Sequence, residues 1–271
     1  MKHETIYMKE KGSMPYARLL TYLWDWSPDI WIDKRPMVLI CPGGGYEKTS
    51  DREAEGVALK IMSMGFHTAV LHYSVAPAEY PTAMLEVARA VKTFREHAEE
   101  WKIDTDKIVV MGFSAGGHLA ASYGVFWNEP WIAEAIDAQM EELRPNGLLL
   151  GYPVITSNQK LWHEGSFRNL LGSQWSEENA EKLSLEKRIG PQTPKTFLWA
   201  TFTDQVVPVE NSVLWVQEMC RQGISVEFHL YEKGPHGLSL ANEVTDNVAQ
   251  IRHQKECQSW IDLAQVWLKN L

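Results

Sequence analysis

Apolar residues along the chain alternate between short continuous runs and stretches with helical spacing. The continuous runs, rich in β-branched residues, predict strands at 37–42, 66–73, 107–113, 147–154, 195–202 and 224–231. Apolar residues three and four positions apart predict helices at 51–64, 82–99, 115–126, 208–222 and 260–271. Because strands and helices alternate, we expect an α/β protein with a mostly parallel central sheet and helices on both of its faces.

One predicted connection is much longer than the others. Residues 156–194 separate two predicted strands and contain several large apolar side chains. A connection of that length in a compact domain is usually functional or forms a small subdomain. We therefore expect a single domain over residues 1–271, in which 156–194 form a helical cap insertion over one end of the sheet.

Composition and charge narrow the choice of partners. The 271 residues carry a formal net charge of −9 without a Lys/Arg cluster, which argues against nucleic acid and anionic membranes as partners. The N-terminal segment lacks the apolar core of a secretory signal, and no apolar stretch is long enough to span a bilayer. We therefore expect a cytoplasmic protein. An exposed sheet edge is compatible with a homodimer.

The cysteines and histidines give no sign of a metal or redox cofactor. The three cysteines are widely spaced, which predicts neither a disulfide framework nor zinc-type pairs. No histidine pair has a metal-ligand spacing such as His-Glu-x-x-His. We expect no metal and no cofactor.

A serine stands between glycines in the stretch GFSAGGHLAAS, directly between a predicted strand and a predicted helix. A serine on so sharp a turn has a strained backbone, and small residues two positions before and after it let the turn close. Such a turn exposes the Ser114 hydroxyl at the carboxyl end of the sheet, where open α/β sheets bind ligands. The N–H of Ala115, at the start of the helix, can then contact an oxyanion. The alternative interpretation is an ordinary strand-to-helix turn.

A serine hydroxyl becomes a nucleophile when a base takes its proton and an acid orients the base. His236 follows a predicted strand in the glycine-flanked loop GPHGLSL, and Asp204 follows another predicted strand. Asp204 also suits the N-cap of the helix after it. His118 lies on the same predicted helix as Ser114, and we interpret it as a packing residue. The order Ser114, Asp204, His236 is that of the α/β-hydrolase triad.

The chain resembles α/β-hydrolases of the esterase/lipase group, and more narrowly the acetyl esterases described as acetylxylan-esterase-like. The matching stretches are CPGGGYEKTSDREAEGVA, LHYSVAP, DKIVVMGFSAGGHLAAS, GYPVIT, FRNLLG, PKTFLWATFTDQVVPVENS and GPHGLSLA, which together extend over most of the chain from about residue 37. The resemblance implies that Ser114 is the nucleophile, His236 the general base and Asp204 its partner. It also implies that the N–H of Gly44 or Gly45 supplies a second oxyanion donor beside that of Ala115.

The resemblance implies short acyl groups, above all acetyl, on carbohydrate or small esters as substrates. Aromatic side chains could stack on a sugar or enclose a small acyl group, or form the core of the cap, and the candidates are Tyr46, Tyr152, Trp162, Phe167 and Trp175. Two other functions remain open from the sequence. The same fold and triad serve serine peptidases, and a hydrolase fold can also serve as a non-catalytic binding protein.

Overall fold

The computed structural model describes residues 1–249 and 251–271 and contains a central sheet of eight strands in the order β1-β2-β4-β3-β5-β6-β7-β8. The strands are β1 (Thr5–Tyr7), β2 (Arg18–Tyr22), β3 (Arg35–Cys41), β4 (His67–His72), β5 (Ile103–Phe113), β6 (Gly147–Gly151), β7 (Thr196–Thr201) and β8 (Val226–Tyr231). β3 to β8 run parallel, and β1 and β2 add an antiparallel edge. The predicted mostly parallel sheet is confirmed.

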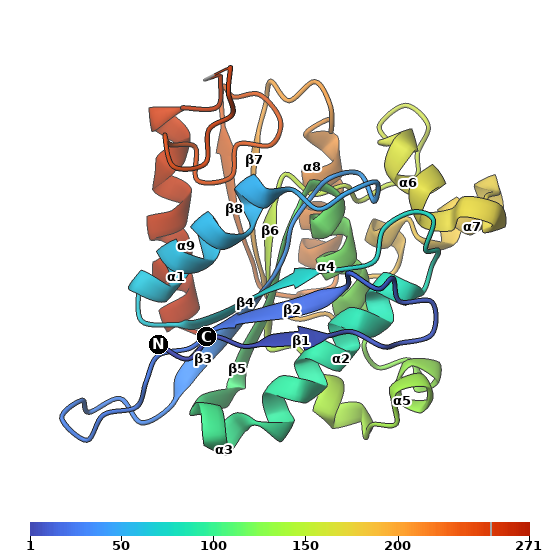
Figure 1. Cartoon of the computed structure of the whole chain (residues 1–271). Coiled ribbons are helices and arrows are strands. Elements are labelled where there is room, and N and C mark those ends of the chain that lie inside the picture. The colour runs from blue at the N-terminus through green and yellow to red at the C-terminus, as the bar shows by residue number, and fades with distance from the viewer. Residues whose placement is uncertain (250) are drawn as a thin grey trace.

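Helices cover both faces of this sheet (Figure 1). The α-helices are α1 (Glu55–Ser63), α2 (Thr82–Glu96), α3 (Ala98–Trp101), α4 (Ser114–Phe126), α5 (Pro130–Ile136), α6 (Glu164–Leu171), α7 (Glu177–Lys182), α8 (Glu210–Arg221) and α9 (Trp260–Lys269). Short 3₁₀ helices are η1 (Asp51–Glu53), η2 (Met140–Leu143), η3 (Gly172–Gln174), η4 (Leu185–Lys187) and η5 (Lys255–Ser259). No helix in the described residues is both long and apolar enough to cross a membrane.

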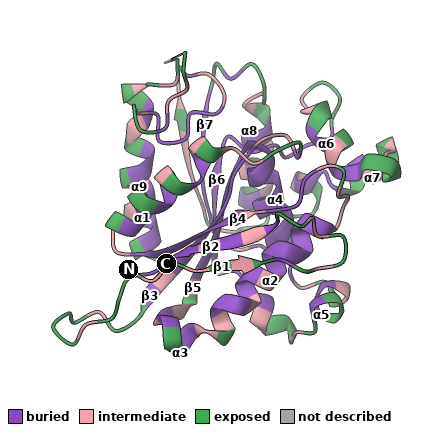
Figure 2. Cartoon of the chain, in the orientation of Figure 1, coloured by how far each residue is buried: buried purple, intermediate pink, exposed green. Residues whose placement is uncertain are grey.

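Alternate residues of the parallel strands build two separate hydrophobic cores. In β3, Met37 and Leu39 join the core under α2, α4 and α8, whereas Val38 and Ile40 join the core under α1 and α9. This alternation follows from the period of two in a strand, with both faces covered. Figure 2 shows the strands at the centre as buried and the outer helix faces as exposed.

The antiparallel edge is absent from the sequence prediction. β1 has three residues with exposed or half-buried side chains, so it shows no apolar run. β2 pairs with both β1 and β4, and its ladder to β4 buries Leu19 and Thr21. An edge strand packs against the core on one side, so its sequence shows a weak pattern of apolar residues.

The long connection at 156–194 contains α6, η3, α7 and η4, the short helices that the sequence predicts there. Asn211 of α8 holds the beginning of this segment, since its Oδ1 accepts the N–H groups of Ile155 at 2.9 Å and Thr156 at 3.1 Å. His118 of α4 contacts the carbonyl oxygen of Leu183 through Nε2 at 3.1 Å. These buried contacts tie the segment to the helices beneath it.

Candidate active site

Ser114 lies on the sharp turn between β5 and α4. Its φ is +52°, a left-handed value that costs a non-glycine residue about 1–2 kcal/mol. The flanking glycines are sterically required: a Cβ on Gly112 would lie 2.0 Å from the carbonyl oxygen of Gly116. A Cβ on Gly116 would lie 2.1 Å from the carbonyl oxygen of Cys41. The turn closes only with glycine at both positions.

The structure brings Ser114, His236 and Asp204 together at the carboxyl ends of the parallel strands. His236 Nε2 lies 2.8 Å from Ser114 Oγ, and His236 Nδ1 lies 2.6 Å from Asp204 Oδ2. Ser114 is 9% exposed and Asp204 6% exposed, so the serine hydroxyl lies at the base of a surface cleft and the carboxylate is withdrawn from water. A carboxylate on Nδ1 favours the tautomer in which Nε2 is free to take a proton.

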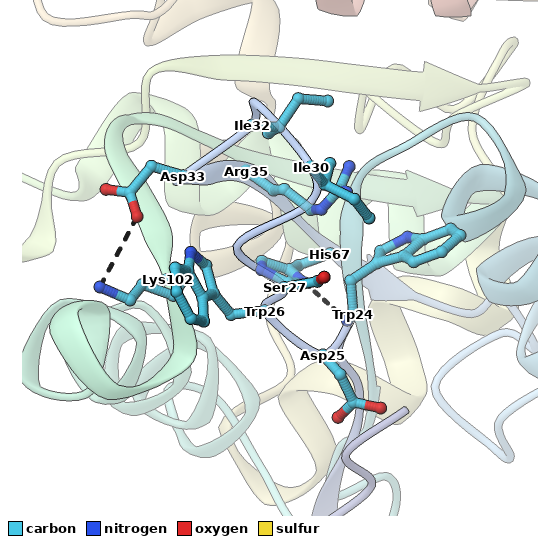
Figure 3. A pocket seen from close by; sticks show the side chains of 10 residues that line it. All are labelled: Trp24, Asp25, Trp26, Ser27, Ile30, Ile32, Asp33, Arg35, His67 and Lys102. Atoms are coloured by element: carbon cyan, nitrogen blue, oxygen red, sulfur yellow. Dashed lines mark hydrogen bonds and ion pairs between the residues drawn. The ribbon is translucent and has the colours of Figure 1, made fainter.

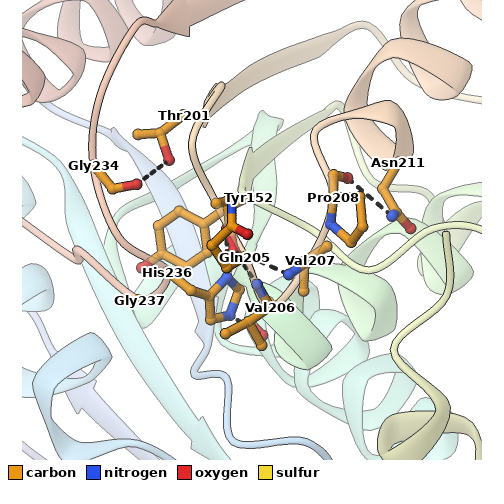
Figure 4. A network of polar contacts seen from close by, with 12 residues as sticks. Tyr152, Thr201, Gln205, Val206, Val207, Pro208, Asn211, Gly234, His236 and Gly237 are labelled. Carbon is orange, nitrogen blue, oxygen red and sulfur yellow. Dashed lines mark hydrogen bonds and ion pairs between the residues drawn. The ribbon is translucent and has the colours of Figure 1, made fainter.

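Both oxygens of Asp204 are committed to hydrogen bonds. Oδ1 accepts the backbone N–H groups of Val206 at 2.8 Å and Val207 at 3.0 Å, while Oδ2 faces His236. Figure 4 shows Val206 and Val207, on the loop after β7, beside His236. The carboxylate is therefore held in one orientation in the structure, with Oδ2 toward the imidazole.

The loop that carries His236 is held at its beginning. Thr201 Oγ1, at the end of β7, donates to the carbonyl oxygen of Gly234 at 2.9 Å (Figure 4). Thr203 Oγ1 accepts the N–H of the same glycine at 3.0 Å. The imidazole ring and the Tyr152 ring form a T-shaped pair, with 5.1 Å between ring centroids. These contacts fix the position of the ring relative to Ser114.

A cleft of about 530 Å³ opens above Ser114 and His236, and the loop after β3 forms one wall of it. Gly44 and Gly45 line this wall with φ values of +128° and +67°. Within the described residues, neither of their N–H groups has a hydrogen-bond partner. The N–H of Ala115 lies in the first turn of α4, where no intrahelical carbonyl accepts it. Three free donors thus lie around the serine.

The predicted aromatic residues do not line this cleft. Tyr46 is buried and its hydroxyl contacts His118 Nδ1 at 3.0 Å, and Tyr152 is buried behind His236. Phe167 is 1% exposed, and Trp162 packs on both Phe167 and Trp175. The structure thus uses them to pack the site's support and the 156–194 segment, and direct contact of any of them with a substrate stays a prediction.

His163 is a cleft residue that the sequence analysis does not select. It caps α6, where its Nδ1 accepts the N–H of Ser166 at 3.2 Å, and it lines the cleft beside Gly45. Burial lowers its pKa, and the charge of a protonated His236 lowers it further. Nδ1 is therefore an acceptor, and the neutral ring carries its hydrogen on Nε2. No local motif distinguishes this histidine from the others in the sequence.

A second cavity lies beneath the loop between β2 and β3, at the amino ends of the parallel strands (Figure 3). It measures about 10 Å³ and is lined by Trp24, Trp26 and His67 among others. This volume is close to that of one water probe, so it admits no larger ligand. His67 Nδ1 accepts the N–H of Trp24 at 3.1 Å, which gives the ring a structural role.

The sheet order and the site at its carboxyl edge define an α/β hydrolase. The fold is similar to the solved structure of an acetyl ester-xyloside bifunctional hydrolase from Caldicellulosiruptor lactoaceticus, with a TM-score of 0.79 and 33% sequence identity. The superposition covers 94% of this chain and 88% of the chain of that hydrolase. Within that class the chain belongs to the BD-FAE family, whose model matches residues 27–219.

Two curated relatives carry names that bear on function. The chain is 35% identical over 219 residues to endo-1,4-beta-xylanase B of Butyrivibrio fibrisolvens, and 27% identical over 211 residues to an acetylxylan esterase of Xylanibacter ruminicola. The alignments cover 78% and 73% of this chain. They cover 33% and 40% of the two relatives, so the chain spans less than half of either protein.

Proposed function

We propose that this protein is a serine carboxylic-ester hydrolase that removes short acyl groups, above all acetyl, from carbohydrate or small esters. One observation carries the proposal: Ser114 Oγ, His236 Nε2 and Asp204 Oδ2 form a continuous relay that opens into a cleft. The named acetylxylan esterase relative supports the acyl group and the class of alcohol.

The reaction proceeds through an acyl-enzyme. His236 takes the proton of Ser114 as Oγ attacks the ester carbonyl, and the oxyanion forms toward the N–H groups of Gly44, Gly45 and Ala115. The imidazolium then gives its proton to the leaving alcohol. Water then attacks the acyl carbon as His236 takes its proton. The bond from that carbon to Ser114 Oγ breaks, the imidazolium returns the proton to Oγ, and the acid leaves.

The donors around the oxyanion account for much of the expected rate. Loss of one such donor costs about 10²–10³-fold in kcat in a comparable site. Glycine at 44 and 45 lets the backbone approach the reacting oxygen, and a Cβ on Gly44 would lie 2.2 Å from the carbonyl oxygen of Lys48. The loop therefore tolerates no side chain at that position.

The test compares initial rates on p-nitrophenyl acetate, butyrate and octanoate. Ser114→Ala should lose about 10⁶-fold in kcat, whereas Ser122→Ala, a buried serine two turns further along α4, should keep the wild-type rate. Acetate should be the fastest ester. Equal inactivity of wild type and Ser114→Ala on all three esters would refute the proposal.

The alcohol part of the substrate needs a separate measurement. Acetate release from acetylated xylo-oligosaccharides should exceed release from the same molar amount of a simple alkyl acetate. A rate on the alkyl acetate that equals or exceeds the sugar rate would remove carbohydrate from the proposal and leave a small-ester hydrolase. A peptide amide assay with no turnover would exclude peptidase activity.

A further inference from the structure

The 3₁₀ helix η1 lies between the two loops that shape the site. It follows the glycine loop after β3 in sequence and contacts the His236 loop in space. Two consecutive residues of η1, Arg52 and Glu53, direct their polar groups to these loops. Neither takes part in the proton transfers of the proposed reaction, and neither forms an ion pair in the described part of the chain.

Glu53 fixes the glycine loop through one carboxylate oxygen. The residue is 2% exposed, and its Oε2 accepts the N–H of Gly43 at 2.8 Å. A Cβ on Gly43 would lie 2.7 Å from that oxygen and 2.9 Å from the Cβ of Ser114, so the loop is packed against both. The bond orients the Pro42–Gly43 peptide, directly ahead of Gly44 and Gly45, and it leaves the N–H groups of these two glycines free for the oxyanion.

The other oxygen of Glu53 reaches the histidine loop through Tyr152. Oε1 accepts from the Tyr152 hydroxyl at 2.7 Å, and that hydroxyl accepts the N–H of Ser239 at 2.8 Å. Burial raises the pKa of Tyr152 well above its ordinary value, and the Glu53 carboxylate raises it further. The phenol thus stays protonated and donates to Glu53. Its ring lies beside the imidazole of His236.

Arg52 makes a second connection to the same loop. Its Nη1 donates to the carbonyl oxygen of Gly237 at 2.7 Å, and its own carbonyl oxygen accepts from Ser239 Oγ at 2.6 Å. Both contacts fall within three residues of His236. η1 therefore binds the glycine loop at Gly43, and it binds the histidine loop at Gly237 and Ser239, directly after His236.

We propose that Glu53, assisted by Arg52, is a positioning residue that holds the oxyanion glycines and the catalytic histidine in one common geometry. The proposal rests on the ester-hydrolase function proposed above. It acts through Gly43 and Tyr152, so Glu53 itself does not touch the reacting atoms. β3 and β8, the strands before the two loops, are not neighbours in the sheet, and η1 supplies a direct link between the loops.

Glu53→Gln is the decisive substitution. Both carboxylate oxygens accept hydrogen bonds, but glutamine offers one acceptor. Either the Gly43 N–H loses its acceptor, or the amide NH₂ faces the Tyr152 hydroxyl, which then donates to nothing. We expect kcat for p-nitrophenyl acetate to fall about 10- to 100-fold, less than removal of a whole oxyanion donor. KM should change less than about threefold, because ground-state binding does not use these contacts.

A structural effect is separated by counting active sites. Titration with a serine-directed phosphonate gives the concentration of competent enzyme, and kcat is expressed per titrated site. The matched control is Glu86→Gln: Glu86 is a fully buried carboxylate on α2 that accepts from the N–H of Ser74 at 2.7 Å and from the hydroxyl of Ser13 at 2.7 Å. That variant should lose thermal stability while its kcat per site stays at the wild-type value.

The outcomes distinguish the two proposals. If wild type hydrolyses the ester and Glu53→Gln retains more than about a third of its kcat per site, the positioning role is overturned while the esterase stands. If wild type hydrolyses no ester and is not labelled, the proposed function fails and the positioning role fails with it. Should Glu53→Gln not fold, Arg52→Met replaces it, since Arg52 is partly exposed, and a reduced kcat per site is again expected.

Discussion

Replacing Asp204 with asparagine tests the relay, and the neighbouring backbone N–H groups determine which way the new amide points. Oδ1 of Asp204 accepts two backbone N–H groups, from Val206 at 2.8 Å and Val207 at 3.0 Å. In the variant the amide oxygen must take this place, because an amide NH₂ there would face two donors. The NH₂ group then faces His236 Nδ1, which becomes a hydrogen-bond acceptor.

The change reaches Ser114 through the tautomer of the imidazole. A neutral histidine with an unprotonated Nδ1 carries its hydrogen on Nε2, the atom that lies 2.8 Å from Ser114 Oγ. An N–H at that point cannot take the serine proton. We expect kcat/KM for p-nitrophenyl acetate to fall about 10⁴-fold, as the same exchange does in a serine protease triad.

The assay compares wild type, Asp204→Asn and Asp204→Ala, with the melting temperature measured for each. The asparagine variant keeps both backbone bonds and should melt close to wild type. The alanine variant leaves two N–H groups without an acceptor, and the buried one, that of Val207, should cost about 1–3 kcal/mol. An asparagine variant with wild-type melting and more than about a tenth of the wild-type rate would refute the tautomer argument.

Three further predictions concern stability and accessibility. Gly116→Ala should destabilise the fold by about 3 kcal/mol or more, since its Cβ would lie 2.1 Å from a backbone carbonyl oxygen. The control is Gly223→Ala, where φ is +68° and no atom lies within 4 Å of the added Cβ, and it should cost only about 1–2 kcal/mol. Thermal denaturation measures both. Burial lowers the pKa of His118 to about 4 in the folded protein, compared with about 6.5 in the unfolded chain. Between these two pH values the unfolded chain binds a proton on His118 that the folded protein does not bind. The free energy of unfolding should therefore fall as pH drops from 6.5 toward 4, by on the order of 3 kcal/mol from this group, and urea titrations at several pH values should show a smaller fall for His118→Gln. A thiol reagent should modify the exposed Cys220 rapidly in the native protein, and the buried Cys257, whose pKa burial raises to about 11, only in denaturant.

The apolar pattern predicts the parallel strands and the main helices because the apolar positions of each element are the ones that the fold buries. β3, β5 and β6 appear where continuous apolar runs occur, with ends shifted by a few residues. The turn at Ser114 is also visible, since only glycine fits two residues before and after it. The order of serine, acid and base along the chain then selects residues that the fold places within hydrogen-bond distance.

The supporting residues were not visible in the sequence for a physical reason. Glu53 is a charged residue in a polar stretch, and nothing local predicts that it is 2% exposed. Its burial depends on Tyr152 and Gly43, which meet it only in the folded sheet. His163 likewise acquires its position from the packing of α6. Contacts between distant loops leave no periodic or short-range mark in a single sequence.

The sheet brings the loops of the site near one another, whereas hydrogen bonds at the loops fix the direction of individual polar groups. Parallel strands bring the carboxyl ends of β3, β5, β7 and β8 to one edge, which places the four loops within reach of one another. Strands do not fix the direction of a peptide N–H beyond their ends. That is done by hydrogen bonds outside the strand ladders. Glu53 binds Gly43 and Thr201 binds Gly234 from a neighbouring element, and the amides around Asp204 bind it within its own loop. Substitutions in the strand cores should therefore lower stability while kcat per folded molecule is kept, and substitutions in the cross-loop bonds should lower kcat with a smaller loss of stability.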